Sequence, residues 1–564
     1  MATIIADNII SPLGLTTGEN LRAVMSGQSS LCRYEATDGL PFPYTASRFS
    51  DTTRRSLTIA GYTFWESLVI NSIRRALGQC QGLMNGTTAL ILSTTKANVG
   101  MLKSPDDEPF VTSPGQSALR VAQALGLDTM PIVVSNACIS GVSAMITADR
   151  LLKSGDYDNA IVCGAEELSR FIISGFHSLM ALSEDECRPF DIERLGLNLG
   201  EAAATVILTR HGSPIAPQWQ IMDWAVSNDS YHISSPSPRG DGTLRVLDRL
   251  TRGIDINDVA VINLHGTATM YNDQMESKAI ERANMSDVPA NALKGYFGHT
   301  MGAAGILETI LTYRALDEGL ILATRGFSEI GVSAKVNISP ETRMTDKKTF
   351  VKIISGFGGG NAGIRITKTT VPAEQQLTCN SLSITHRVTI TPHRLWLDGI
   401  DYPMANNGSS TLTDIYKKYV GDYPKFYKMD SLSKLGFVAA RILTNAESDN
   451  DASTTRDIAL FNKKSSLMTD IEYIASVGHG RDFYPSPSIF VYTLPNIVTG
   501  EIAINHKYCG ETVFYVLPDR DDELINRLVR SMTADKNHSS ILAGWVEYES
   551  PDQFVADMFI AQKQ

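Results

Sequence analysis

The sequence predicts an α/β protein whose N-terminal part holds a largely parallel sheet. Residues 1–370 alternate short β-branched runs with amphipathic runs, and many of the β-branched runs are nearly all apolar, as in strands buried on both faces. The expected strands are Thr88–Ser93, Ile132–Ser135, Ala160–Cys163, Thr205–Leu208 and Val259–Leu264. The expected helices are Ser56–Leu77, Gly141–Ser154 and Ala303–Leu316. Such alternation is typical of layered α/β domains.

After these elements the chain passes through a glycine turn and a linker into a second unit. Two β-like runs within residues 350–366 flank Gly356–Gly360, which predicts two strands joined by a turn. Residues 367–381 are polar and aperiodic and contain a proline, so we expect a linker there. Residues 382–564 form a smaller α/β unit. Its expected elements are strands at Arg387–Ile390, Ile489–Thr493 and Val513–Leu517, helices at Lys434–Ala446 and Asp521–Thr533, and an exposed loop at Glu447–Thr455.

Composition and charge exclude several classes of function. The chain of 564 residues is 43% hydrophobic and 20% charged, which indicates a folded protein, and its net charge of -11 argues against a nucleic-acid binder. No apolar run is long enough to span a membrane, and the N-terminus does not resemble a signal peptide. The seven cysteines lack metal-type spacing, so we expect neither disulfides nor a metal site, and we expect a cytoplasmic protein.

Cys138 is the first candidate for chemistry. It follows an apolar run and precedes a helical pattern that begins with small residues, which predicts a position at a helix N-terminus. The helix dipole and unpaired N–H groups there favour a thiolate, so we expect a lowered thiol pKa. The alternative is a buried cysteine that serves only as a small apolar residue. The remaining cysteines lack this context, and we interpret them as structural: Cys32, Cys80, Cys163, Cys187, Cys379 and Cys509.

His265 also lies where an apolar strand is expected to end. Ligands gather at the carboxyl ends of strands in α/β sheets. Thr267, Thr269 and Asp273 follow closely and are able to orient an imidazole or brace its loop. The alternative is a structural histidine at a strand end, which is the more common case for a single residue.

Two glycine-rich segments supply further candidates. His299 is flanked by glycines and preceded by Lys294; a phosphate-binding loop is a weaker interpretation, because neither phosphate-loop spacing is present. The turn that contains Phe357, Gly358 and Gly359 is suited to present N–H groups at close range, as an oxyanion hole requires. The alternative for this turn is a flexible hairpin tip.

Taken in order, these segments resemble the β-ketoacyl-acyl carrier protein synthases, the elongating condensing enzymes of the thiolase superfamily. The resemblance covers residues 1–370. It rests on Ser11-Pro12-Leu13-Gly14, Asn136-Ala137-Cys138, Cys187-Arg188-Pro189-Phe190-Asp191, Gly200-Glu201-Ala202, His265-Gly266-Thr267, Gly298-His299-Thr300 and Gly356-Phe357-Gly358-Gly359.

The resemblance implies a thiolase-like, five-layered αβαβα fold of two pseudo-equivalent halves. It also implies that Cys138 carries an acyl chain as a thioester and that His265 and His299 assist malonyl decarboxylation and stabilise the enolate. The N–H groups of Cys138 and Phe357 would form the oxyanion hole, and Phe357 would gate the acyl pocket. Lys294 and Glu308 would support His299. A second histidine, where starter-type synthases have asparagine, favours the elongating type.

The resemblance also implies the partners. They are an acyl carrier protein, acyl and malonyl thioesters, and a second ketosynthase-like chain in a homodimer or heterodimer. No cofactor is implied, because phosphopantetheine belongs to the carrier. Departures at Asn136, Ala268, Met270 and Gly360 border the pocket and favour a polyene or aryl-polyene pathway over housekeeping fatty-acid synthesis.

The second unit resembles the ketosynthase segment that precedes the nucleophile. The similarity rests on Leu494–Ile504, and the expected nucleophile position falls near Asp519, where no cysteine stands. We therefore expect a truncated, catalytically dead ketosynthase-like module, similar to part of a chain-length factor. An unrelated α/β module is the alternative.

Three functions follow from the sequence. The first is a decarboxylative β-ketoacyl synthase. The second is a non-catalytic subunit that sets chain length or scaffolds a carrier protein. The third is an acyl-CoA thiolase-like enzyme, which lacks support because no second catalytic cysteine follows the glycine turn.

Overall fold

Three five-stranded arrangements of the same topology make up the protein. The computed structural model describes residues 2–80, 87–102, 113–213, 215–370, 381–404, 411–447, 454–478, 480–533 and 540–563. The first arrangement has the order β1-β8-β6-β4-β5, in which β4 is parallel to β5 and β6 while β8 is antiparallel to β6 and β1. Its strands are β1 (Thr3–Ile10), β4 (Thr88–Ser93), β5 (Ile132–Val134), β6 (Asn159–Glu166) and β8 (Ala202–Thr209).

The second arrangement repeats this order as β9-β16-β15-β10-β11, with the short β13 added at the end. Its strands are β9 (Gln218–Asn228), β10 (Val259–Asn263), β11 (Pro289–Asn291), β13 (Asn337–Ile338), β15 (Thr349–Gly356) and β16 (Gly360–Thr369). The two sheets are therefore equivalent halves, as expected.

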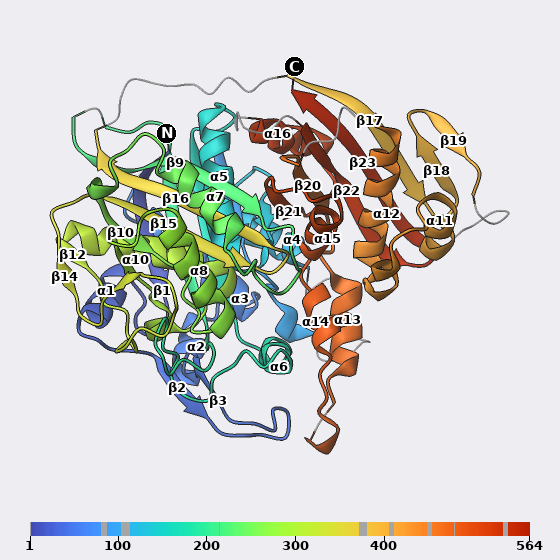
Figure 1. Ribbon diagram of the computed structural model, residues 1–564. Helices are drawn as coiled ribbons and strands as arrows, with labels where there is room; N and C mark the ends of the chain where they lie inside the picture. Colours follow the sequence, from blue (N-terminus) through green and yellow to red (C-terminus); the bar gives the residue numbers. More distant parts are fainter. Residues whose placement is uncertain are drawn as a thin grey trace.

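Helices cover both sheets and fill the space between them. Two central helices, α5 (Ser140–Lys153) and α10 (Ala304–Asp317), contact strands of both sheets, and nearly every residue of each is buried. The outer faces are covered by α3 (Phe64–Leu77) and α4 (Pro114–Leu125) on one side and by α7 (Asp241–Leu250) and α8 (Met270–Arg282) on the other. The predicted five-layered αβαβα fold is confirmed (Figure 1).

Smaller elements lie around these layers. They are α1 (Thr17–Met25), α2 (Asp51–Leu57), α6 (Arg170–Ser178) and α9 (Lys294–Phe297), the strands β2 (Leu31–Tyr34), β3 (Tyr44–Ser47) and β7 (Leu199–Gly200), and the pair β12 (Leu320–Ile321) and β14 (Arg343–Met344). Within the described ranges no helix is both long and apolar enough to cross a membrane.

The second unit, orange to red in Figure 1, repeats the topology of the first sheet once more. Its order is β17-β23-β22-β20-β21, with the same parallel and antiparallel pairings. Its strands are β17 (Leu382–Thr391), β20 (Asp457–Asn462), β21 (Thr512–Val516), β22 (Ser540–Ser550) and β23 (Gln553–Lys563), and the hairpin β18 (Arg394–Leu397) and β19 (Ile400–Tyr402) extends its edge. Its helices are α11 (Leu412–Tyr419), α12 (Ser431–Ala446), α13 (Leu467–Ser476), α14 (Pro487–Tyr492), α15 (Ile497–His506) and α16 (Asp522–Met532).

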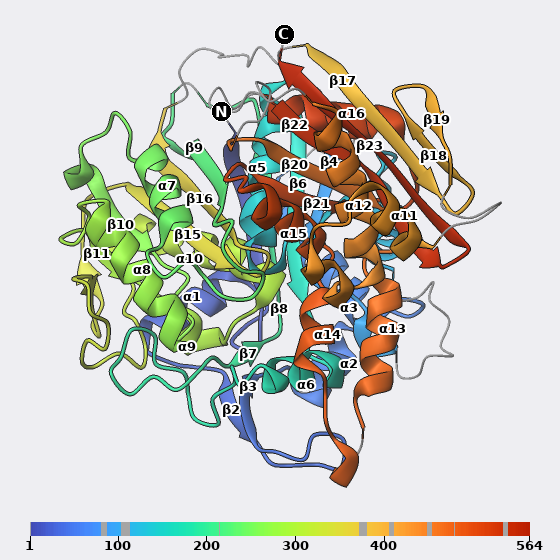
Figure 2. The same cartoon turned by 45° about the vertical axis from the view of Figure 1, so that its right-hand side comes forward.

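The two units join through their edge strands. Strand β21 pairs antiparallel with β5, with Tyr515 opposite Val134 and Val516 opposite Val133. Apolar clusters run through this junction without a break and contain residues of both units. Figure 2 shows the second unit packed along the side of the first rather than suspended from it. The second unit therefore continues the first sheet and its core.

Most predicted elements are confirmed, and three predictions are wrong. Residues 58–63 separate α2 from α3, because Thr63 caps α3 in a capping box with Glu66. The expected strand Ile489–Thr493 is helix α14 and its C-cap, because Ser486 caps a helix that begins with proline. Residues 367–369 of the expected linker belong to β16. Residues 371–380 of that linker, Cys379 and residues 448–453 of the expected loop lie outside the described residues.

A buried ion pair across the junction gives a test of this packing. Both guanidinium ends of Arg150, which is 1% exposed, bond to the Glu511 carboxylate of the second unit, one of them at 2.9 Å. Replacement of Arg150 by methionine leaves an unpaired buried carboxylate and is expected to lower the free energy of unfolding by about 3–5 kcal/mol. Urea unfolding followed by tryptophan fluorescence measures this loss.

The matched control is Arg530→Gln, which removes a pair with Asp156 across the same junction at the surface. It should cost less than about 1 kcal/mol. Equal losses in the two variants would contradict the buried pairing.

Candidate active site

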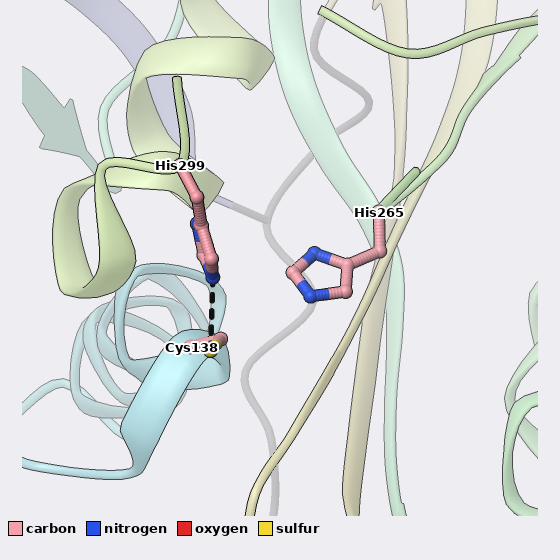
Figure 3. A group of neighbouring side chains, drawn as sticks. All are labelled: Cys138, His265 and His299. Carbon is pink, nitrogen blue, oxygen red and sulfur yellow. Dashed lines mark hydrogen bonds between the residues drawn. The ribbon is translucent and has the colours of Figure 1, made fainter. Parts of the chain in front are cut away.

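Three loops at strand ends bring Cys138, His265 and His299 together (Figure 3). Cys138 lies in the turn between β5 and α5, and His265 follows β10. His299 follows α9 and precedes α10. The candidate ligand atoms of the three side chains all lie within 4.8 Å of one another. The structure thus places the three residues as the sequence analysis expected.

The His299 imidazole contacts the sulfur of Cys138 directly. Its Nε2 lies 3.0 Å from Sγ, and its Nδ1 accepts a hydrogen bond from the backbone N–H of Met301 at 3.2 Å. A neutral ring that accepts at Nδ1 must carry its proton on Nε2. His299 therefore directs an N–H donor toward the space above the sulfur.

His265 faces the same space from the opposite side. Its ring lies 5.1 Å from that of His299, centroid to centroid, in an edge-to-face arrangement. Its backbone N–H and that of Gly266 donate to the two oxygens of the buried Glu276 carboxylate, at 2.7 and 2.8 Å. Glu276 thereby fixes the loop that carries His265.

A buried charge network lies behind the histidines. Lys294 donates to the His265 carbonyl at 2.5 Å and to Glu308 at 2.7 Å, and Lys352 donates to the other oxygen of Glu308. Burial alone would raise the pKa of Glu308, but the two ammonium groups outweigh it and hold that pKa below its usual value. Lys294 therefore bonds the His265 backbone, and its effect on His299 is electrostatic.

The two imidazoles are neutral. Burial, with the positive charges of Lys294 and Lys352, places the pKa of His265 and that of His299 well below the usual histidine value. Neutral rings serve as hydrogen-bond donors without carrying a proton to release.

The expected lowering of the Cys138 pKa is wrong. Burial raises the pKa of the thiol to about 12, against the opposing effect of Lys294. The loss of solvent around the sulfur disfavours the thiolate more than the turn and the helix start favour it, because the effect of a helix dipole falls off within one turn. The resting site therefore holds a neutral thiol.

The loop after His265 is braced as proposed from the sequence. Thr267 donates its backbone N–H to Asp273 at 3.0 Å, and its hydroxyl lies 2.9 Å from that of Thr269. Asp273 also accepts from the backbone N–H of Phe190 at 2.8 Å. These contacts shape the loop and do not reach the imidazole itself.

The glycine turn between β15 and β16 lies against the nucleophile. A Cβ on Gly356 would come within 3.1 Å of the Cys138 nitrogen, so the two backbones are in close contact. Gly358 and Gly359 have φ values of +85° and +77°, which only glycine adopts without strain. The turn thus carries Phe357 to the edge of the site, where we expected it.

Two cavities meet at Cys138. A cavity of about 430 Å³ opens past His265, His299 and Thr269. A second, apolar pocket of about 20 Å³ is also lined by Cys138, and its walls include Phe490, Thr493 and Leu494 of the second unit. Phe357 and Phe176 line both cavities.

Sequence reasoning missed three charged residues of the site. Lys352 stands in an otherwise apolar strand, Val351-Lys352-Ile353, and that interruption was the available signal. Glu276 interrupts no apolar run, so its signal in the sequence was weaker. Glu166 ends β6 and accepts from the backbone N–H groups of Thr95 and Gly302 at 2.5 and 3.0 Å, which ties two loops of the site together. Burial raises the pKa of Glu166 to about 7.

The same three side chains form a set that a divalent metal accepts. One thiol and two imidazoles are zinc ligands when the thiol is ionised. The neutral thiol and the Met301 bond to His299 fit a hydrogen-bonding role better.

Comparison with protein families gives matches over both halves of the first unit. Residues 34–213 match the model described as "Beta-ketoacyl synthase, N-terminal domain", and residues 219–328 match "Beta-ketoacyl synthase, C-terminal domain".

Curated relatives agree with these matches. The chain is 30% identical over 257 residues to 3-oxoacyl-(acyl-carrier-protein) synthase 2 of Rhizobium meliloti, covering 42% of this chain and 60% of the relative. It is 28% identical over 404 residues to the protein of the same name from Vibrio cholerae, covering 63% of this chain and 96% of the relative. The alignment thus spans less than two thirds of the length of the Rhizobium relative.

Solved structures share the fold. A ketosynthase in complex with its chain length factor, from Xenorhabdus doucetiae, matches 65% of this chain and 98% of its own with a TM-score of 0.58 and 24% identity. The structure titled "PfaC Keto synthase-Chain length factor" matches 100% of this chain and 78% of its own with a TM-score of 0.75 and 14% identity. The second match includes the C-terminal unit.

The raised pKa of Cys138 is testable by alkylation. Because only thiolate reacts, the rate of iodoacetamide modification at Cys138 should rise about tenfold per pH unit from about pH 7 to pH 10. A thiol of ordinary pKa, near 8.5, would level off above about pH 9. Peptide mass spectrometry measures the rate, with the exposed Cys32 as the internal control for the reagent. A plateau below pH 8 would show that the site stabilises a thiolate.

Proposed function

The chain belongs to the β-ketoacyl synthase family, and we propose that it catalyses a decarboxylative Claisen condensation. The substrates are an acyl group, carried as a thioester on Cys138, and a malonyl group on an acyl carrier protein. The observation that carries this proposal is the position of one sulfur beneath two neutral imidazoles at the meeting point of two cavities.

Acyl transfer comes first. The Cys138 sulfur attacks the carbonyl of an acyl thioester, the bond from that carbonyl to the carrier sulfur breaks, and the thiol proton leaves with the carrier thiol. Because the free thiol is neutral, deprotonation accompanies attack rather than preceding it. The N–H groups of Cys138 and Phe357 hold the developing oxyanion.

Condensation follows at the same place. The malonyl carbon–carboxylate bond breaks, CO2 leaves, and the electron pair passes to the thioester oxygen as an enolate. His265 and His299 donate N–H bonds to that oxygen, and His299 has its donor fixed on Nε2 by Met301. The enolate carbon then attacks the acyl group on Cys138, a carbon–carbon bond forms, and the bond to sulfur breaks. The sulfur leaves as a thiolate and takes up one proton from solvent, which restores the neutral thiol.

The other residues act through these groups. Lys294 holds the His265 backbone, and Glu308 holds Lys294. Burial, with the positive charges of Lys294 and Lys352, keeps both imidazoles neutral. Thr267, Thr269 and Asp273 brace the loop, and Gly358 and Gly359 shape the turn of Phe357. No cofactor of the protein enters the steps, since the pantetheine arm comes with the carrier protein.

We propose that the second unit, residues 382–564, is a catalytically inactive ketosynthase-like module. Three observations support this: it repeats the strand order of the first sheet, its β21 occupies the edge of β5, and the turn after β21, residues 517–521, contains no cysteine. Since β5 is already paired within the chain, the second unit takes the place of a partner at this edge. A homodimer or heterodimer, expected from the sequence, would need another surface.

The place of the reaction follows from its chemistry. Carrier-bound thioesters and free cysteines fit fatty-acid or polyketide-type synthesis in the cytoplasm, and all six cysteines in the described ranges are free. The departure at Asn136 supports a polyene-type pathway, which stays a proposal from the sequence.

The alternatives differ in covalent chemistry. A non-catalytic subunit forms no acyl-enzyme, and a thiolase-like enzyme accepts acyl-CoA as readily as acyl-carrier thioesters. Intact mass analysis after incubation with matched acyl-CoA and acyl-carrier thioesters separates the three. We expect a mass increase of one acyl group, faster with the carrier thioester.

Replacement of Cys138 tests the nucleophile. Cys138→Ala should form no acyl-enzyme and no β-ketoacyl product, because no other group at the site can hold a thioester. Mass spectrometry and product analysis measure both, and Cys163→Ala, a buried cysteine in β6, serves as the matched control. Normal elongation by Cys138→Ala would overturn the proposal.

Replacement of His299 separates the two stages. His299→Ala should lower the condensation rate by about 10²–10³-fold, because one enolate donor is lost, while some self-acylation remains. Single-turnover assays that start from isolated acyl-enzyme report condensation alone. If acylation and condensation fall by the same factor, His299 does not act chiefly on the enolate.

A further inference from the structure

We propose that contacts with the second unit position the catalytic groups for acyl transfer through two side-chain amides. One is Asn136 of the first unit, which bonds to β21, and the other is Asn496 of the second unit, which bonds to the glycine turn. Both are positioning residues. The inference rests on the proposed function, because it assigns their effect to the acylation of Cys138. Asn496 lies outside the motifs that identify the nucleophile and the histidines, and Asn136 is a position of the nucleophile motif at which this chain departs from the family.

Asn136 extends the strand pairing between the two units into the nucleophile turn. Its Nδ2 donates to the carbonyl of Thr512 at 2.8 Å, and its Oδ1 accepts from the backbone N–H of Phe514 at 3.0 Å. The preceding Ser135 donates its backbone N–H to Phe514 at 3.0 Å. The side-chain amide therefore takes the role of one more peptide group against β21, where β5 has already ended.

This contact matters because the turn is strained immediately after it. Ala137 has a φ of +49°, a left-handed conformation that costs energy for any residue with a Cβ. Ser140 closes the turn from the other side, since its hydroxyl accepts from the Asn136 N–H at 2.7 Å and donates to the Ala137 carbonyl at 2.6 Å. A strained turn persists only where neighbouring groups hold it. Here β21 holds it through Asn136, and Ser140 holds it from the other side.

Asn496 holds the glycine turn that carries Phe357. It stands at the N-terminus of α15 in the second unit, is 5% exposed, and donates from Nδ2 to the carbonyl of Phe357 at 2.8 Å. Its Oδ1 has no hydrogen-bond partner among the described residues. A buried amide oxygen without a hydrogen-bond partner costs stability. We therefore assign the amide of Asn496 to its bond with Phe357 rather than to stability.

The backbone around Asn496 fits the glycine turn closely. A Cβ on Gly500, one turn into α15, would lie 2.7 Å from the carbonyl oxygen of Gly358. On its other side that carbonyl accepts from Asn228 at 2.8 Å. The glycine turn is therefore clamped between the first unit and α15, and Asn496 fixes the peptide that follows the proposed oxyanion donor of Phe357.

The two amides predict different kinetic signatures. Asn496 acts on the oxyanion donor, which acyl transfer needs and alkylation does not. Asn136 acts on the nucleophile itself, so its loss should disturb both reactions. In the Asn496 variants a merely structural role would lower both reactions together. In the Asn136 variants it would lower stability, with no recovery in Asn136→Thr.

The experiment compares acylation with alkylation in the full chain. Asn496→Leu and Asn496→Asp both remove the donor, and either one that folds suffices. Self-acylation from an acyl-carrier thioester gives kcat and KM by intact mass, and iodoacetamide modification of Cys138 gives thiol reactivity. Arg530→Gln, which removes a surface contact between the units, is the matched control.

For the Asn496 variants we expect at least a tenfold fall in kcat for acylation, with KM and the alkylation rate within twofold of wild type. For Asn136→Leu and Asn136→Asp we expect acylation and alkylation both to change by at least fivefold, with Asn136→Thr recovering part of the loss. Arg530→Gln should match the wild type in every assay.

Wild-type kcat in the Asn496 and Asn136 variants would overturn the inference and leave the proposed function standing, provided that Cys138→Ala forms no acyl-enzyme. An equal fall of acylation and alkylation in the Asn496 variants would overturn the role of Asn496. Absence of acylation in the wild-type chain would overturn the proposed function, and the inference with it.

Discussion

The antiparallel pairing of β21 with β5 is the constraint on which the site depends. Strand β5 is short, has only β4 beside it in its own sheet, and runs directly into the turn of Cys138. An uncovered edge strand frays and invites pairing with other chains. With β21 in place, the strand that carries the nucleophile is hydrogen-bonded on both sides, and the apolar core passes beneath it from one unit to the other.

Burial then decides the protonation of the site. The desolvation that raises the pKa of Cys138 also keeps His265 and His299 neutral. Lys294 and Lys352 reinforce the effect on the histidines, and Lys294 opposes the effect on the thiol. The proposed condensation gains from this arrangement, because neutral donors stabilise an oxyanion only while it exists.

The sequence predicted the fold and the three central residues because their signals are local. Cys138 and His265 each follow an apolar strand, and His299 lies in a glycine-rich segment before a helix. It failed where the signal lies elsewhere in the chain. Asn136 meets Thr512 across 376 residues, and no local pattern contains that contact. The β-branched and aromatic composition of Ile489–Thr493 was outweighed by a serine cap and a proline. The thiol pKa depends on solvent access, which only packing determines.

The make-up of the second unit follows from the same constraint. A five-residue strand cannot be stable by itself in water, so β21 needs a sheet beside it and helices over that sheet. The five strands β17 and β20–β23, with α12, α15 and α16, supply this much and repeat the strand order of the first sheet. The role that we propose for this unit, to hold β5 and the glycine turn, needs a covered edge strand and the amide of Asn496 rather than a nucleophile.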